Sequence, residues 1–343
     1  MKKILVTGSA GFIGFHLTKA LLAKGYRVIG IDNLNNYYDP QLKANRLEDL
    51  DQFVADQNLK DSYQFIKLDI THKSELSNLF RESQFDIIFN LAAQAGVRYS
   101  IENPSTYVDT NLVGFTNVLE CCRDNDIKHL IFASSSSVYG MNKKQPFGVG
   151  DNTDYPVSLY AATKKANELI GFAYSHLYKI PCTGLRFFTV YGPYGRPDMA
   201  YYKFAEAINA GHTIDVYNYG DMKRDFTYID DITEGLVRIV TKIPKDIMDP
   251  SSYAQAPFKI FNIGNNTPVN LLDFIDIIGK ALNKRVKKNL LPMQQGDVPE
   301  TFADIDDLYN EIGFKPKTPI DEGIEKFISW YTDYVMHYPA QTK

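Results

Sequence analysis

The stretch Thr7-Gly8-Ser9-Ala10-Gly11-Phe12-Ile13-Gly14 decides the fold of the first half of this chain. It follows an apolar run at residues 4–7 that predicts a β-strand, and it opens a helical pattern at residues 12–23. Glycines at this spacing let the backbone turn tightly, approach a pyrophosphate and pack the helix on a sheet. The free N–H groups of the helix N-terminus would then face the phosphates. We predict a Rossmann-type site for a dinucleotide.

The ends of the next strands carry residues suited to the rest of that dinucleotide. Asp32 follows the second predicted strand, where its carboxylate would hold the ribose hydroxyls and repel a 2′-phosphate, which favours NAD over NADP. Asp69 follows the third strand and would accept from the adenine amino group, with Ile70 against the ring, although an Asp there also serves as a helix cap. The fourth strand closes on small residues that permit close approach of the cofactor or simply pack tightly: Leu91, Ala92 and Ala93.

Composition excludes several classes of protein. The chain has 343 residues, of which 44% are hydrophobic and 23% charged, as in ordinary globular proteins, and this length suggests two structural units. A net charge of −4 offers no broad cationic surface, so we expect no nucleic-acid partner. No apolar run is long enough to span a membrane. Three cysteines and six histidines show no metal-ligand spacing, so we expect no metal and a soluble protein of the reducing cytoplasm.

Strand and helix patterns alternate along the chain, which is typical of a parallel sheet covered by helices on both faces. Strands are predicted at residues 4–7, 27–31, 64–68, 87–90, 130–134 and 183–187, and helices at 12–23, 73–80, 104–124 and 158–178. Beyond residue 188 we place a second lobe with a short strand at 259–263 and helices at 271–282 and 320–334. The predicted fold is α/β: a Rossmann-type doubly wound parallel sheet (residues 1–188, with later segments returning to it) and a smaller C-terminal α/β lobe (189–343) for the substrate.

Two segments carry the chemistry of the predicted site. A run of four serines, residues 134–137, follows the fifth strand, and Tyr160 and Lys164 lie four residues apart at the start of a helix, on one face. A neighbouring ammonium and a nicotinamide cation would favour the phenolate of Tyr160, making it a base near neutral pH. Lys164 would also hold the nicotinamide ribose. A serine hydroxyl would orient the reacting alcohol.

These motifs together resemble those of the extended short-chain dehydrogenases/reductases, and within them the nucleotide-sugar epimerases and dehydratases. The resemblance runs through TGSAGFIG (7–14), LAAQAG (91–96), SSSSVYG (134–140), Tyr160 and Lys164, LRFFTVYGP (185–193), RDFTYIDD (224–231) and GDVPETFAD (296–304). It implies Ser135 as the catalytic serine, with Ser134 as the alternative. The implied cofactor-binding residues are Gly8, Gly11, Phe12, Ile13, Gly14, Asp32, Asn33, Asp69, Ile70, Leu91, Ala92, Ala93, Asn111, Tyr160, Lys164 and Phe188.

The neighbours of the catalytic serine favour one reaction of this group. The 4,6-dehydratases place an acidic pair after the catalytic hydroxyl, whereas this chain has Ser136 and Ser137, which cannot supply acid and base for loss of water. The UDP-glucuronate decarboxylases also carry an acidic residue in this run. Epimerisation remains, because oxidation and re-reduction at C4 need one base, one cofactor and a ketone that can rotate. A dinucleotide sensor without chemistry would not need Ser135, Tyr160 and Lys164 together.

Three segments, residues 33–39, 95–104 and 192–200, resemble the UDP-glucuronate 4-epimerases. The resemblance implies conversion of UDP-glucuronate to UDP-galacturonate; the alternatives are a UDP-glucose or UDP-N-acetylhexosamine 4-epimerase, or a decarboxylase. A uronate carboxylate needs donors, which Ser136, Ser137, Thr189 and Arg196 would supply, or these hydroxyls only stabilise turns. Because the 4-keto sugar is a β-keto acid, these groups would also have to hold the carboxylate out of the alignment that releases CO2.

The resemblance further implies how the UDP moiety and a second subunit are bound. Arg224 resembles the diphosphate-binding arginine, Val216 and Tyr217 belong to the uracil-facing strand, and Asp297 would hold the uridine ribose. Gln294 stands where neutral-sugar epimerases have a phosphate-binding arginine, and Arg98 would contact a phosphate or lie in an exposed loop. The family also implies a homodimer through residues 104–124 and 158–178, whose apolar positions would equally suit a core. The substrate class suggests a role in polysaccharide biosynthesis.

Overall fold

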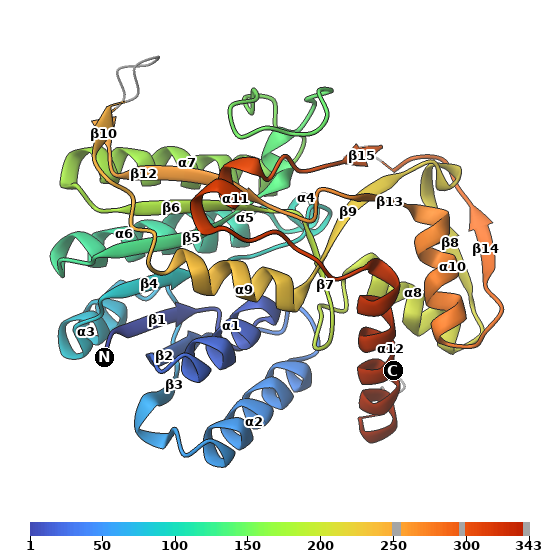
Figure 1. Cartoon of the computed structure of the whole chain (residues 1–343), viewed down its shortest axis with the longest axis horizontal. Helices are drawn as coiled ribbons and strands as arrows, with labels where there is room; N and C mark the ends of the chain where they lie inside the picture. The colour runs from blue at the N-terminus through green and yellow to red at the C-terminus, as the bar shows by residue number, and fades with distance from the viewer. Residues whose placement is uncertain (249–254, 295–298, 339–343) are drawn as a thin grey trace.

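The computed structural model describes residues 1–248, 255–294 and 299–338. Its centre is a seven-stranded parallel sheet in the order β12-β6-β5-β4-β1-β2-β3 (Figure 1). The strands are β1 (Lys3–Thr7), β2 (Arg27–Asp32), β3 (Tyr63–Lys67), β4 (Ile87–Asn90), β5 (His129–Ser135), β6 (Cys182–Phe187) and β12 (Phe258–Ile263). Every residue of β4 and β6 is buried, as in a sheet covered on both faces. The predicted doubly wound α/β fold is confirmed.

Helices cover the two faces of this sheet and create two hydrophobic cores. One face carries α1 (Phe12–Ala23), α2 (Pro40–Asp56) and α9 (Ile229–Ile239), which pack around side chains such as Phe15, Leu50 and Ile232. The other carries α3 (Lys73–Ser83), α6 (Phe115–Asp124) and α7 (Leu159–Tyr178), around Phe80 and Phe115. The sheet therefore lies between two apolar layers, which hold its strand ends in fixed positions.

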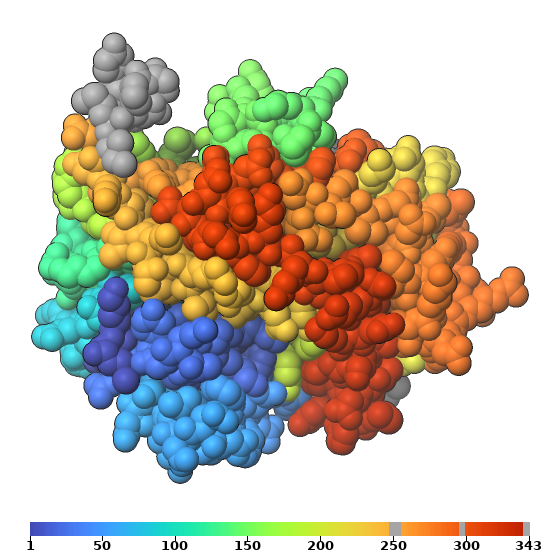
Figure 2. Space-filling view, viewed as in Figure 1, coloured from blue at the N-terminus to red at the C-terminus, as the bar shows by residue number. Residues whose placement is uncertain are grey.

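A second lobe projects from the carboxyl ends of the strands (Figure 1). Its strands are β7 (Thr189–Tyr191), β8 (Thr213–Val216), β9 (Lys223–Tyr228), β13 (Pro268–Asn270), β14 (Lys287–Leu290) and β15 (Glu300–Thr301). Its helices are α8 (Ala200–Asn209), α10 (Leu271–Ala281) and α12 (Ile320–His337). β9 pairs with β7, β13 and β15, while β8 pairs with β14. In Figure 2 the red C-terminal segments lie against both the orange lobe and the blue N-terminal unit, where Asn45 donates to the Tyr334 hydroxyl at 3.1 Å.

The structure differs from the sequence prediction in several places; helices α8 and α9, for example, were not predicted. The strand at 259–263, placed in the second lobe, is β12, which pairs with β6 at the edge of the large sheet. The helix predicted at 104–124 is α5 (Pro104–Tyr107) and α6, joined by a π-helical segment at Val108–Gly114. Helix α2 was not predicted, because its surface is largely polar and only the cap Asp39 followed by Pro40 signals its start.

The remaining elements are short. They are α4 (Tyr99–Glu102), α11 (Asp306–Ile312), the hairpin of β10 (Ile247–Met248) and β11 (Gln255–Ala256), and 3-10 turns at Lys60–Ser62, Ser136–Tyr139 and Tyr217–Gly220. Within the described residues, no helix combines the length and the apolarity that crossing a bilayer requires. The turn at Ser136–Tyr139 follows β5 directly, and three of its residues line the cavity described below: Ser136, Ser137 and Tyr139.

Candidate active site

A cavity of about 990 Å³ lies along the carboxyl ends of the large sheet, between the sheet and the second lobe. Ligands of open α/β sheets bind at this edge. The glycine-rich loop and the ends of β2, β3 and β4 line one end of the cavity, and residues of β8 and β9 line the other. Its size and two-ended lining suit an elongated ligand pair, a dinucleotide beside a nucleotide sugar.

The glycine-rich loop is packed so tightly that its glycines cannot be replaced without movement. Gly8 has φ +72°, and a Cβ on it would lie 2.8 Å from the Ala92 nitrogen at the end of β4. A Cβ on Gly14 would lie 2.1 Å from the Gly8 oxygen. α1 begins at Phe12, directly after Gly11, so its first N–H groups face the cavity. The loop therefore fits the diphosphate of a dinucleotide.

Two carboxylates stand at the ends of β2 and β3 in the same cavity. Asp32 is buried and accepts from the Leu34 backbone N–H at 2.8 Å. Asp69 accepts from the Asn33 side chain at 2.7 Å and from the Thr71 N–H and hydroxyl at 2.9 and 2.8 Å. Burial by itself would raise the pKa of Asp69, but these hydrogen bonds outweigh it and the pKa is lowered. The lowered pKa keeps Asp69 an ionised acceptor at neutral pH, and both side chains present oxygens that accept hydrogen bonds.

The structure distinguishes the two candidate serines. The Ser134 hydroxyl donates to Glu168 Oε1 at 2.6 Å, and Glu168 forms a buried ion pair with Arg186 at 2.8 Å. Ser134 also lines the cavity, but its hydroxyl is engaged by Glu168. The Ser135 hydroxyl lines the cavity, 3.1 Å from the Ser137 hydroxyl, and accepts from the Ser137 N–H at 3.2 Å. Ser135 is the serine whose hydroxyl can meet a substrate.

Tyr160 and Lys164 enter the cavity from the start of α7, whose N-cap Ser158 accepts from the Ala161 N–H at 3.1 Å. Lys164 is buried and donates to the Ala133 carbonyl at 2.8 Å; burial lowers its pKa to about 8. Burial raises the pKa of Tyr160, against the opposing effects of Ser135 and of the Arg196 charge. The protein groups alone therefore do not produce the acidic tyrosine expected from the sequence, because desolvation of the phenolate outweighs them.

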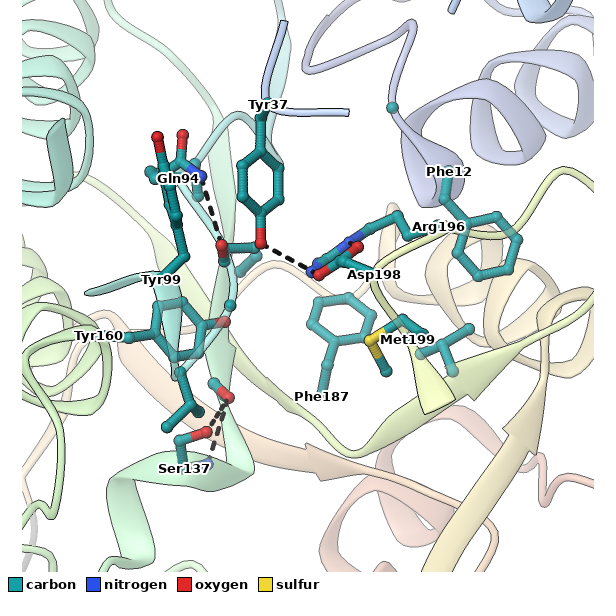
Figure 3. A pocket seen from close by; sticks show the side chains of 18 of the residues that line it. Phe12, Tyr37, Gln94, Tyr99, Ser137, Tyr160, Phe187, Arg196, Asp198 and Met199 are labelled. Atoms are coloured by element: carbon teal, nitrogen blue, oxygen red, sulfur yellow. Dashed lines mark hydrogen bonds and ion pairs between the residues drawn. The ribbon is translucent and has the colours of Figure 1, made fainter. Parts of the chain in front are cut away.

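Across the cavity, a charged pair is held by a tyrosine from the other unit (Figure 3). Arg196 contacts Asp198 through two bonds, Nε to Oδ1 at 2.9 Å and Nη2 to Oδ2 at 2.5 Å. The Tyr37 hydroxyl donates to the same carboxylate at 3.1 Å. Burial would raise the pKa of Asp198, but Arg196 outweighs it and the pKa is lowered. The pair remains ionised and faces Tyr160 and Ser137.

Most of the predicted site residues line the cavity together. They are Gly8, Gly11, Phe12, Ile13, Gly14, Asp32, Asn33, Asp69, Ile70, Leu91, Ala92, Ala93, Arg98, Ser135, Ser136, Ser137, Tyr160, Lys164, Phe188, Thr189, Arg196, Tyr217 and Arg224. Arg98 stacks over the Tyr217 ring at 5.4 Å. Arg224 donates to the carbonyls of Lys223 and Pro299 at 2.8 and 3.0 Å.

Two predicted residues that the structure describes are not found on the cavity wall. The Asn111 side chain is buried, accepts from the Gln94 N–H at 2.8 Å and donates to Thr163 at 3.0 Å, so it positions the segment after β4 instead of facing the cavity. Val216 is fully buried in the core, because strand alternation turns it away from the exposed Asp215. Asp297 lies outside the described residues.

Several residues that line the cavity had no predicted role. Tyr37 and Asp198 lay within quoted motifs, and Lys43 and Lys203 lie on helices that were not predicted. Gln94 follows the small residues after β4. An acidic residue two positions from an arginine was the available signal for Asp198; nothing in the sequence relates Tyr37 to it, since 161 residues separate them.

Comparisons with known proteins agree with this geometry. Residues 4–264 match the family described as NAD dependent epimerase/dehydratase. The chain is 52% identical to protein CapI of Staphylococcus aureus, over 97% of this chain and 99% of that one. It is 45% identical to a probable UDP-glucuronate 4-epimerase of Rhizobium meliloti, over 96% of each chain.

A similar solved structure is the UDP-glucuronic acid 4-epimerase of Bacillus cereus, in complex with UDP-glucuronic acid and NAD. It is 32% identical to this chain, with a TM-score of 0.86 over 97% of this chain and 99% of that one. The predicted resemblance to extended short-chain dehydrogenases/reductases is confirmed. This chain belongs to the NAD dependent epimerase/dehydratase family.

Proposed function

We propose that this protein inverts C4 of UDP-glucuronate to give UDP-galacturonate, with NAD as its cofactor. The observation that carries the proposal is that Ser135, Tyr160 and Lys164 line one cavity. The two residues that follow Ser135 and begin the turn after β5 are Ser136 and Ser137, where a dehydratase would have acidic residues. This arrangement supports proton removal from an alcohol, and it lacks the acidic residues directly after the catalytic serine that elimination of water would use. The names of the relatives and of the structural neighbour support the uronate as substrate.

Each catalytic residue has a task that its position supports. Tyr160 takes the proton of the C4 hydroxyl and returns it, while the Ser135 hydroxyl orients the same oxygen. The Lys164 ammonium, held by the Ala133 carbonyl, binds the cofactor ribose and stabilises the phenolate by its charge. NAD, when bound, supplies the hydride acceptor and donor at C4. Inversion requires the 4-keto sugar to turn over between the two transfers, which a wide cavity permits.

The C6 carboxylate is held by hydroxyls in this proposal. Ser136 and Ser137 follow the catalytic serine, and Thr189 begins β7 on the facing side of the cavity. Arg196 is already ion-paired with Asp198, so its positive charge is largely balanced. It would therefore orient the substrate carboxylate more than it would attract it. Several weak donors around one carboxylate fix its plane, and a fixed plane keeps the C5–C6 bond from the alignment that expels CO2.

The UDP group would lie against the second lobe. Tyr217 and the backbone of β8 support the base, and Arg224 supports the diphosphate. Gln294 has no charge, so we assign the second phosphate contact to Lys203 of α8, which lines the same end of the cavity. Asp297 remains the predicted ribose contact. In this proposal, residues 1–188, together with returning segments such as β12, form the cofactor domain, and the remainder of residues 189–343 forms the substrate lobe.

One assay tests the proposed function. Purified protein with its retained cofactor is incubated separately with UDP-glucuronate, UDP-glucose and UDP-N-acetylglucosamine, and nucleotide sugars and CO2 are quantified. We expect UDP-galacturonate from the first substrate, little CO2, and much slower change of the two neutral sugars. Turnover of a neutral sugar without turnover of the uronate would instead assign a hexose epimerase, and CO2 as the main product would assign a decarboxylase.

A homodimer completes the proposal. Apolar side chains stay exposed on the face of α7 and the π-helical segment before α6, namely Val108, Val113, Leu169, Leu177 and Tyr178. Packing of this face against a second copy of the chain would remove these side chains from water. We expect the protein to sediment as a dimer and Leu169→Glu/Leu177→Glu to sediment as a monomer.

The cellular setting is also part of the proposal. The three cysteines are free and buried, a state that the reducing cytoplasm preserves. UDP-galacturonate is an activated sugar, so the reaction that consumes it is a glycosyl transfer, and we propose polysaccharide biosynthesis as that use. If epimerisation precedes glycosyl transfer, cells that lack a uronosyl transferase should accumulate UDP-galacturonate. An unchanged amount of UDP-galacturonate would contradict this order.

A further inference from the structure

Lys43 places a buried ammonium group at the ribose end of the cofactor cavity. Its side chain lies in the first turn of α2 and is 6% exposed. Nζ lies 3.1 Å from Asp32 Oδ1 and 3.1 Å from Asn35 Oδ1, and 5.6 Å from the centre of the Tyr38 ring. All of these residues line the cavity. The Asp32 carboxylate is therefore half of an ion pair and not an isolated negative charge.

The hydrogen bonds of Asp32 leave one oxygen for a ligand. The Leu34 N–H and the Lys43 ammonium both donate to Oδ1. Among the described residues, none donates to Oδ2, so Oδ2 is the oxygen available to ribose hydroxyls. A 2′-phosphate is an ester of one of these hydroxyls. Its oxygens would come next to the carboxylate, and Lys43 lies within ion-pair distance of that carboxylate.

We propose that Lys43, with Asn35 and Tyr38, forms a latent binding site for the 2′-phosphate of NADP, which Asp32 alone keeps closed. While Asp32 is present, the phosphate meets a like charge and competes with an existing buried ion pair. Without the carboxylate, Lys43 is a buried cation that lacks a counter-ion, and an anionic group on the ribose restores the pairing. Asp32 thus decides whether NAD or NADP is preferred. When Asp32 is replaced, Lys43 determines how strongly the preference shifts towards NADP.

The test identifies the dinucleotide that the purified protein retains. Bound nucleotides are released by acid denaturation and quantified as NAD and NADP. Asp32→Asn is nearly isosteric, and its Oδ1 can still accept from the Leu34 N–H. We expect the ratio of bound NADP to NAD to rise at least about tenfold, since a charge-assisted contact replaces a repulsion. Asp32→Asn/Lys43→Gln should lose this gain, and Asp32→Asn/Lys43→Arg should keep most of it.

A matched control uses another paired lysine. Lys19 pairs with Asp49 at 2.5 Å outside the cavity lining, so Asp32→Asn/Lys19→Gln should retain NADP as Asp32→Asn does. An unchanged ratio in Asp32→Asn, or NADP retention that survives Lys43→Gln, overturns the proposal. If Asp32→Asn is purified without nucleotide, adenosine 2′,5′-bisphosphate should bind it more tightly in calorimetry than AMP, which differs only by lacking the 2′-phosphate. Equal affinity for the two probes would also overturn the proposal.

This inference rests on the dinucleotide site and is independent of the sugar. Failure of UDP-glucuronate turnover would remove the proposed function without changing the nucleotide ratios. Conversely, an unchanged nucleotide ratio in the Asp32 variants would leave the epimerase assay intact. The two proposals can therefore fail separately.

Discussion

The two ends of the cavity are built in different ways. The cofactor end rests on backbone geometry in one continuous stretch, residues 7–14, where glycines allow contacts that side chains would block. The nucleotide-sugar end is assembled from side chains far apart in the chain, as in the contact of Tyr37 with Asp198. Buried Arg46 joins the two, donating to the Ala10 carbonyl at 2.8 Å and the Tyr194 carbonyl at 2.7 Å. The loop at the cofactor end therefore depends on close backbone packing, whereas the opposite end depends on side chains that the fold brings together.

The largest expected effect is that of Tyr160→Phe, which should abolish most catalysis on the sugar without affecting binding of the cofactor. Removing the phenol hydroxyl removes the proton acceptor, so turnover should fall by about 10²- to 10⁴-fold. The cofactor end is unchanged, and the variant should therefore retain its NAD through purification. Product formation and bound nucleotide are measured on the same preparation. Wild-type turnover in this variant would show that another group is the base.

Gly14→Ala should damage the opposite end. Its Cβ would lie 2.1 Å from the Gly8 oxygen, so the loop must shift, and we expect about a 10- to 100-fold loss in NAD affinity from overpacking. Gly150→Ala is the matched control, because a Cβ there meets nothing within 4 Å. Bound NAD per protein is the measurement. Full NAD retention in Gly14→Ala would mean that the loop is less rigid than its packing indicates.

A smaller effect should appear when the hydroxyls around the proposed carboxylate position are removed. In Ser136→Ala/Ser137→Ala/Thr189→Val, the sugar ring and cofactor are still bound, but the carboxylate plane is no longer fixed. We expect the ratio of CO2 to UDP-galacturonate to rise about tenfold, corresponding to the loss of a few neutral hydrogen bonds. A CO2 ratio equal to that of the wild type would assign the control of decarboxylation to other groups.

The smallest expected effect is a shift of the pH dependence of kcat, in opposite directions for variants of Arg196 and Asp198. The Arg196 charge lowers the pKa of Tyr160 and the Asp198 charge raises it. A base acts when deprotonated, so the rate rises as pH passes its pKa. Arg196→Gln should move this rising limb to higher pH, and Asp198→Asn should move it to lower pH. Profiles of kcat against pH test the signs; shifts in the same direction would show that Tyr160 does not sense this pair.

Local pattern was enough to predict the cofactor end. Gly8 and Gly11 follow a strand and precede a helix, and Gly14 lies in the first turn of that helix. The fold of such a segment is set by contacts among neighbours in sequence. Tyr160 and Lys164 could be paired for the same reason, since residues four apart share a helix face. Residue patterns alone therefore predicted the doubly wound sheet, the dinucleotide loop and the segments that carry the chemistry.

Tertiary structure decided what depends on contacts between distant segments. It engaged the Ser134 hydroxyl with Glu168, which leaves the Ser135 hydroxyl for a substrate, and it turned Val216 into the core. It also brought Lys43 to Asp32 and Tyr37 to Asp198, and returned β12 to the large sheet. A periodic pattern shows which face of an element is apolar, but the partner of each polar group is chosen only when separate elements pack together.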